Sequence, residues 1–169
     1  MYKALTLFLI SLCGCTSTQQ PLTNIHKENS RLVYHIQPDD TLDEMHFTLC
    51  NVNTAYPYYG TELSPQRDKR ELIKYFKEGY RAPTKSTESG FISIRFMVNC
   101  YGMPGRYRVL QFDKHYQPVT FDSSVTSQLL NLTKGVKDWV PKTFETVTYD
   151  SYCYFLFKIE NGKLTDILP

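Results

Sequence analysis

The sequence lacks the features that mark several common classes of protein. Its 19 Lys and Arg residues nearly balance its 17 Asp and Glu residues, so no strong field would attract nucleic acid. No C-x-x-C or paired His/Cys spacing indicates a zinc or redox site. No G-x-S-x-G nucleophile elbow is present, and no apolar run after the N-terminal one is long enough to span a bilayer. We therefore expect no enzymatic activity, no metal and no cofactor.

The N-terminus has the proportions of an export signal. Lys3 is followed by a short apolar run and by Gly14, a small residue that precedes Cys15. Such a run is typical of a secretory signal and too short for a membrane-spanning helix. We expect residues 1–14 to be a signal peptide, so the protein is exported.

The end of this segment, Leu12-Cys13-Gly14-Cys15, resembles the lipobox of bacterial lipoproteins. The resemblance implies that Cys15 is acylated, and several acyl chains at about 0.8 kcal/mol per buried CH2 would hold the protein on a membrane. Cys13 is the poorer acceptor because Leu12 before it is bulky, and an ordinary secretory signal is the alternative. Thr16 stands where lipoproteins of the inner membrane often carry Asp, which favours an outer-membrane lipoprotein facing the periplasm.

The rest of the chain divides into a spacer, an extension and one domain. Residues 15–30 are polar and lack periodicity, as in a flexible tether. Residues 31–63 give mixed signals, with a short strand indicated at 32–36 only. Residues 64–169 carry regular helix and strand patterns, and their number suits a single domain.

Two amphipathic helices are predicted in this domain. Ser64 and Pro65 have the residue types of an N-cap and a first helical position, and the second helix is predicted over 122–139 with Asp122 as its cap. Each helix has an apolar stripe at helical spacing: Leu72, Ile73, Phe76 and Tyr80 in the first, and Val125, Leu129, Leu132, Val136 and Trp139 in the second.

Strands are predicted where apolar and polar residues alternate, over 91–99, 106–112 and 151–159. A turn at 102–105 makes the first two strands a hairpin. Asn161-Gly162 is a strong tight-turn dipeptide, so 163–168 should return as a short last strand. The order predicts an α+β fold with two helices packed on one face of a small antiparallel sheet.

From Leu72 to Pro169 this pattern resembles the C-terminal domain of TonB-type proteins, and most of all the TonB-like domain of Gram-negative lipoproteins and energy-transducer paralogues. The residues that carry the resemblance are Gly90 to Gly102, Gln117-Pro118, Trp139-Val140-Pro141, Tyr154-Phe155-Leu156-Phe157 and the ending Ile167-Leu168-Pro169.

The resemblance implies a binding module without catalytic residues, whose last sheet strand pairs with an extended peptide of an envelope protein. The implied edge residues are Tyr152, Tyr154, Leu156 and Lys158, while Gly90 and Trp139 correspond to structural positions. An energy transducer also needs a transmembrane helix and a long Pro-rich spacer, so we do not expect this protein to transduce energy. A strand at 163–168 would cover the peptide edge.

The resemblance also implies a disulfide between Cys50 and Cys100. The alternative is a bridge between Cys100 and Cys153, because antiparallel pairing of their strands would bring these two residues close. An exported protein permits either bridge.

Three residue sets indicate rival functions. His35, His46 and Cys50 are conceivable metal ligands, but no fourth ligand accompanies them. Arg95, Arg106 and Arg108 could share one face of the hairpin and bind a ligand carboxylate, or form a solvated face. The third set, the raw material of a hydrolase site, is Asp113, His115, Ser123 and Ser124. A scaffold or inhibitor lipoprotein of an envelope complex is the alternative to a peptide-binding module, and neither partner identity nor oligomeric state follows from the sequence.

Overall fold

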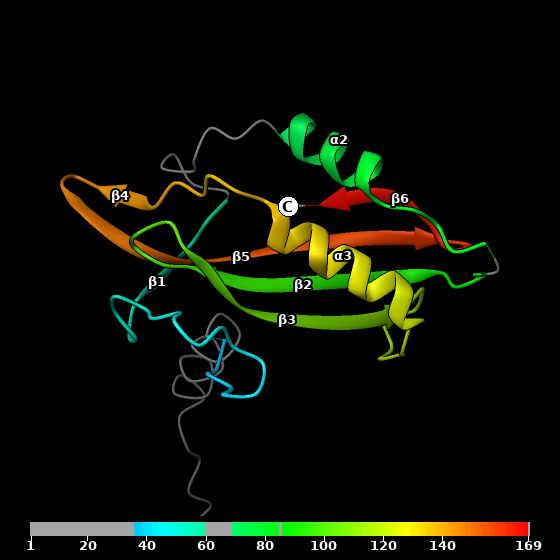
Figure 1. Ribbon diagram of the computed structural model, residues 1–169, viewed down its shortest axis with the longest axis horizontal. Coiled ribbons are helices and arrows are strands. Elements are labelled where there is room, and N and C mark those ends of the chain that lie inside the picture. The colour runs from blue at the N-terminus through cyan, green and yellow to red at the C-terminus, as the bar shows by residue number, and fades with distance from the viewer. Residues whose placement is uncertain (1–35, 60–68, 85, 169) are drawn as a thin grey trace, which may run out of the picture.

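The computed structural model describes residues 36–59, 69–84 and 86–168 (Figure 1). The predicted signal peptide, Cys15, the tether, His35 and the Ser64-Pro65 cap lie outside these residues. No helix in the described part of the chain is long and apolar enough to cross a membrane.

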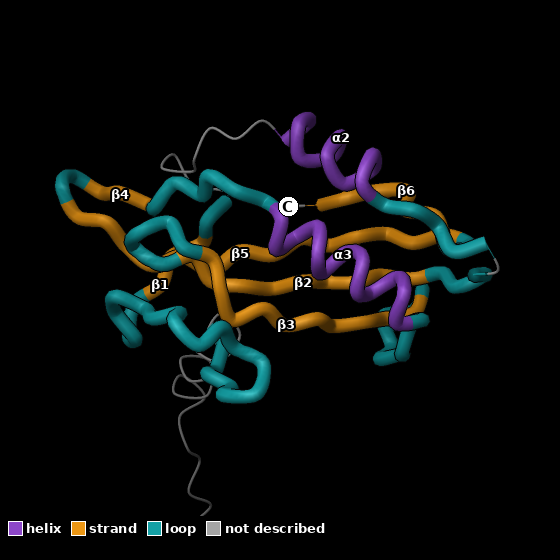
Figure 2. Tube along the Cα trace, viewed as in Figure 1, coloured by secondary structure: helices purple, strands orange, loops and turns teal. Residues whose placement is uncertain are grey.

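The described residues form two helices and a six-stranded sheet, so the fold is α+β. Figure 2 distinguishes the helices from the strands and loops. In chain order the elements are β1 (Ala55–Pro57), α2 (Lys69–Gly79), β2 (Gly90–Val98), β3 (Pro104–Asp113), α3 (Ser123–Gly135), β4 (Lys142–Phe144), β5 (Val147–Glu160) and β6 (Lys163–Leu168).

The sheet has the order β1-β5-β2-β3, and β4 and β6 also pair with β5. The predicted hairpin of β2 and β3 is present, as are the antiparallel partners β5 and β6. The expectation of a purely antiparallel sheet is wrong, because β1 pairs with β5 in parallel. Two short strands, β1 and β4, were not predicted, since three residues are too few to show an alternating pattern.

The main core lies between the sheet and the two helices. Ile92, Ile94 and Phe96 alternate along β2 and face Phe155 and Phe157 of β5 in one buried cluster. The helix residues of the same cluster come from the predicted stripes: Leu72 and Phe76 of α2, and Val125 and Leu129 of α3. Both helices therefore cover the same face of the sheet, as predicted.

The second helix is shorter than the predicted 122–139. It ends at Gly135, and Val136 adopts an extended conformation. Val136 and Trp139 are nonetheless buried, at 2% and 6% exposure, and the Trp139 indole N–H donates to the carbonyl of Val136. The apolar stripe continued past the helix because these two residues reach the core from a loop. Asp122 caps the helix as predicted, by accepting the N–H of Ser124.

Part of the segment 36–59 packs against the other face of the sheet, whereas Tyr58 belongs to the main core. Ile36 and Leu49 form a second buried cluster with Met97, and Phe47 and Tyr152 pack at its border. This cluster covers one end of the open face only. Figure 2 shows the loops of this segment beside the left-hand end of β3.

Candidate peptide-binding edges

The edge of β5 that was predicted to bind a peptide is occupied by the protein's own strands. Tyr152 pairs with Pro57 of β1, and its carbonyl also accepts the N–H of Tyr58. Leu156 and Lys158 pair with Leu168 and Asp166 of β6. Among the described residues, only Tyr154 of the four has no partner strand on this side.

Strand β6 is held in place by contacts beyond its pairing with β5. Ile167 is 2% exposed and belongs to the main core, and Leu164 packs against that core. The turn before β6 is also held: Gly162 donates its N–H to the carbonyl of Glu88, and the Tyr80 hydroxyl donates to the carbonyl of Gly162. Displacing β6 would break all of these contacts.

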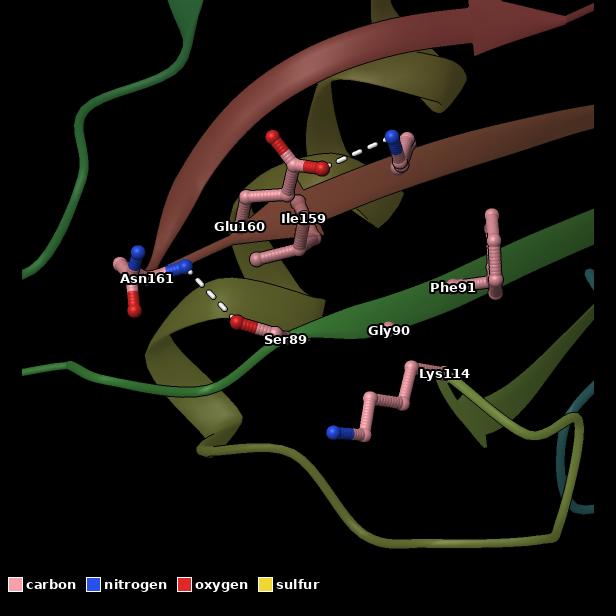
Figure 3. Close-up of a pocket in the computed structure, with 8 residues that line it drawn as sticks. Ser89, Gly90, Phe91, Lys114, Ile159, Glu160 and Asn161 are labelled. Atoms are coloured by element: carbon pink, nitrogen blue, oxygen red, sulfur yellow. Dashed lines mark hydrogen bonds and ion pairs between the residues drawn. The ribbon is translucent and has the colours of Figure 1, made fainter.

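A cavity of about 320 Å³ lies beside this turn (Figure 3). At its rim the N–H of Asn161 donates to the Ser89 hydroxyl at 2.9 Å. Lys158 pairs with Glu160 at 2.8 Å, and this hydrogen bond and charge raise the pKa of Lys158. Lys114 supplies a second ammonium group to the lining. The cavity lies at the end of β5, and β6 still covers the edge of β5 beside it.

Gly90, at the start of β2, is a position that a larger residue would disrupt. Its φ is +154°, and an added Cβ would lie 2.2 Å from the carbonyl oxygen of Phe112. A side chain here would force β2 and β3 apart. The role of this glycine is thus in strand pairing.

The opposite edge of the sheet, formed by β3, is covered at both ends. At one end the Arg106 and Arg108 guanidinium groups donate to the carbonyls of Ile36 and Gln37. At the other end the N–H of Val119 donates to the carbonyl of Gln111. The middle of β3 lies between these two covers.

The arginine face considered as a carboxylate site binds a carboxylate of the chain itself. Asp43 lies 2.6 Å from Nη1 of Arg108 and 3.7 Å from Nε of Arg106. Burial raises the pKa of Asp43, but the Arg108 hydrogen bond, the N–H of Asp39 and the two arginine charges outweigh it and lower the pKa overall. Arg106 and Arg108 therefore anchor the 36–47 segment.

The Cys50–Cys100 disulfide implied by the resemblance is present, with its Cα atoms 6.0 Å apart. Cys153 is a buried free thiol opposite Phe96, too far along β5 from Cys100 for the alternative bridge. Burial raises the pKa of the Cys153 thiol. Because the Cys50 sulfur is bonded to Cys100, it has no thiolate to offer a metal, and the considered site at His46 and Cys50 is not formed.

Asp150 completes this cluster. Its carboxylate accepts the backbone N–H groups of Cys50, Asn51 and Cys100 at 3.1, 2.7 and 2.9 Å. The two sulfur atoms and the carboxylate lie within 4.8 Å of one another. Because the sulfurs are bonded together and both carboxylate oxygens accept hydrogen bonds, the group is a structural cluster and a poor metal site.

The residues of the considered hydrolase site serve local structure. Asp113 accepts the N–H groups of His115 and Gln117, and these hydrogen bonds lower its pKa. Ser123 and Ser124 form the first turn of α3. These hydrogen bonds give Asp113 the role of holding the turn after β3.

Comparison with protein-family models, with curated proteins and with solved structures found no match. The TonB-like resemblance therefore stays a prediction.

Proposed function

We propose that this protein is a lipid-anchored, non-enzymatic binding module of the TonB C-terminal-like type. Acylated at Cys15, it would face the periplasm from the outer membrane and recognise an envelope protein through an extended segment. It would not transduce energy.

One observation carries the peptide-binding part of this proposal. The edge of β5 holds an antiparallel strand over five residue pairs, from Leu156 with Leu168 to Glu160 with Lys163. The backbone groups that the resemblance assigns to a partner peptide thus have the geometry to bind a strand. A partner would exchange with β6 at this edge.

The alternative, a scaffold or inhibitor of an envelope complex, is favoured by the attachment of β6. With Ile167 in the core and the turn hydrogen-bonded to Glu88 and Tyr80, the edge would stay closed. The protein would then bind through its exposed surfaces rather than by strand exchange.

Affinity purification of the full chain from envelope extract, after cross-linking in living cells, distinguishes the two functions. A peptide-binding module should link to an extended segment of its partner through a photoreactive residue placed at Tyr154, on the edge of β5 itself. A scaffold should link through surface positions such as Val140 and leave Tyr154 unlinked. Both positions are exposed, at 47% and 56%, so they are matched.

The lipid anchor is tested separately with Cys15→Ala. We expect the wild-type chain to fractionate with membranes and to carry the mass of the acyl groups. The variant should accumulate as an unprocessed or soluble precursor. If fractionation and mass are the same in both chains, the anchor proposal is wrong.

A further inference from the structure

Val109 of β3 has backbone groups at the edge of the sheet that no described residue pairs. Asp113 donates its N–H to Gln117 and Gln111 accepts from Val119, so these β3 residues direct backbone groups away from β2. Because alternate residues of a strand direct their groups to the same side, the N–H and C=O of Val109 also point outward. No described residue forms a hydrogen bond with either group.

A groove of about 560 Å³ lies over this stretch of β3. Its wall on the helix side is formed by Leu130 and Lys134 of α3, and its other wall by Leu42 and Leu110. In Figure 1, β3 is the lower edge of the sheet and α3 crosses above it. The unpaired backbone groups therefore lie between two partly apolar walls.

We propose that this groove binds an extended peptide that adds an antiparallel strand to β3 at Val109. One peptide residue would exchange both backbone hydrogen bonds with Val109, as an opposed residue does in an antiparallel pair. The next peptide side chains would point alternately toward Leu130 and toward Leu42 and Leu110. The peptide is consequently apolar on both of its faces.

The charges of the lining indicate an acidic residue at one end of the peptide. Arg95, Arg108 and Lys134 line the groove, against one acid, Asp39. The Arg108 guanidinium already donates to Asp43 and to the carbonyls of Tyr107 and Gln37, so few of its N–H groups remain for a ligand. Lys134 lies 3.0 Å from Glu44, but its side chain is 41% exposed and an ammonium group has three donors. A peptide carboxylate near Lys134 would use these remaining donors.

This site differs from the edge of β5 because β6 need not move. This site rests on the proposed function only in that the protein binds an extended segment. What is new is the place where the segment binds and the chemistry of the segment. Variants at Val109 test the new site, whereas removal of β6 tests the edge of β5.

The test measures binding of a fluorescein-labelled peptide, acetyl-Thr-Val-Ile-Val-Glu-Thr-amide, to the full mature chain in nonionic detergent by anisotropy. Val109→Pro removes the outward N–H while leaving the β2 pairing intact, and Val109→Thr is the matched control that keeps it. We expect Val109→Thr to bind as wild type does, and Val109→Pro to bind about tenfold more weakly, because a buried peptide carbonyl loses its donor.

A second pair of variants avoids the backbone. Leu42→Asp places a carboxylate on the groove wall and should weaken binding several-fold, whereas Val140→Asp, away from the groove, should not. Leu42 and Val140 are 58% and 56% exposed, so neither change should unfold the chain. Circular dichroism verifies the fold of each variant.

The assignment is overturned if folded Val109→Pro and Leu42→Asp bind the peptide as tightly as wild type, or if wild type does not bind it. If neither variant changes the peptide affinity but truncation after Gly162 raises it, the peptide binds at β5. The proposed function then stands and the β3 site falls.

Discussion

The carboxylate of Asp150 accepts the backbone N–H of Cys100 at 2.9 Å and, with the N–H groups of Cys50 and Asn51, holds the disulfide against the start of β5. Asp150 is 1% exposed. Three backbone N–H groups donate to its carboxylate. This cluster connects the N-terminal segment, the turn between β2 and β3, and β5.

Asp150→Asn should destabilise the protein by about 2–4 kcal/mol, because the substituted amide offers one acceptor oxygen and places its NH2 group against buried N–H donors. Urea unfolding at neutral pH measures the change. Asp138→Asn, an exposed position, is the control and should change the free energy of unfolding little. Equal stability of the two variants would mean that the cluster contributes nothing.

Replacing both Cys50 and Cys100 by Ser should cost about 4 kcal/mol in the chain-entropy account, since the bridge closes a loop with a sequence separation of 50. Peptide mapping without reductant should yield a Cys50–Cys100 peptide. Cys153 should react with iodoacetamide only after unfolding, because it is buried and its thiol pKa is raised. A Cys100–Cys153 peptide would contradict this pairing.

The attachment of the 36–47 segment should weaken in acid. The folded pKa of Asp43 lies below its ordinary value of 3.8, so its stabilising effect is complete above that value and is lost as pH falls through the folded pKa. Wild type should exceed Asp43→Asn in stability by about 1–2 kcal/mol at pH 7. The difference should shrink toward pH 3, as measured by urea unfolding at both pH values. A constant difference would contradict the role of the carboxylate.

Elements with a repeated pattern could be predicted from the sequence. The alternation along β2 and β5 and the Asn161-Gly162 turn identified three strands and the pairing of β5 with β6, because each strand buries one face on the same core. The length of α3 was overestimated because Val136 and Trp139 maintain the helical spacing from a loop. Spacing alone does not distinguish a helix from a loop that reaches the same core.

The long-range polar contacts could not be predicted. Asp43 with Arg108, and Asp150 with Cys50, are separated by 65 and 100 residues, and no local pattern relates them. The arginines were considered as a site for a ligand carboxylate or as a solvated face, and the carboxylate that binds Arg106 and Arg108, Asp43, lies in a segment without periodicity. Likewise β1 is recognisable only through its parallel pairing with β5.

The central claim, that the edge of β5 accepts an incoming strand, is tested most directly by truncating the chain after Gly162. Removal of β6 exposes the backbone groups of Leu156 and Lys158. Sedimentation velocity, with and without the synthetic peptide Lys-Leu-Thr-Asp-Ile-Leu-Pro, compares the truncated and full chains. We predict that the truncated chain self-associates or binds this peptide, regaining the stability lost with Ile167, while the full chain does neither. A truncated chain that stays folded and monomeric and binds no peptide would contradict the account.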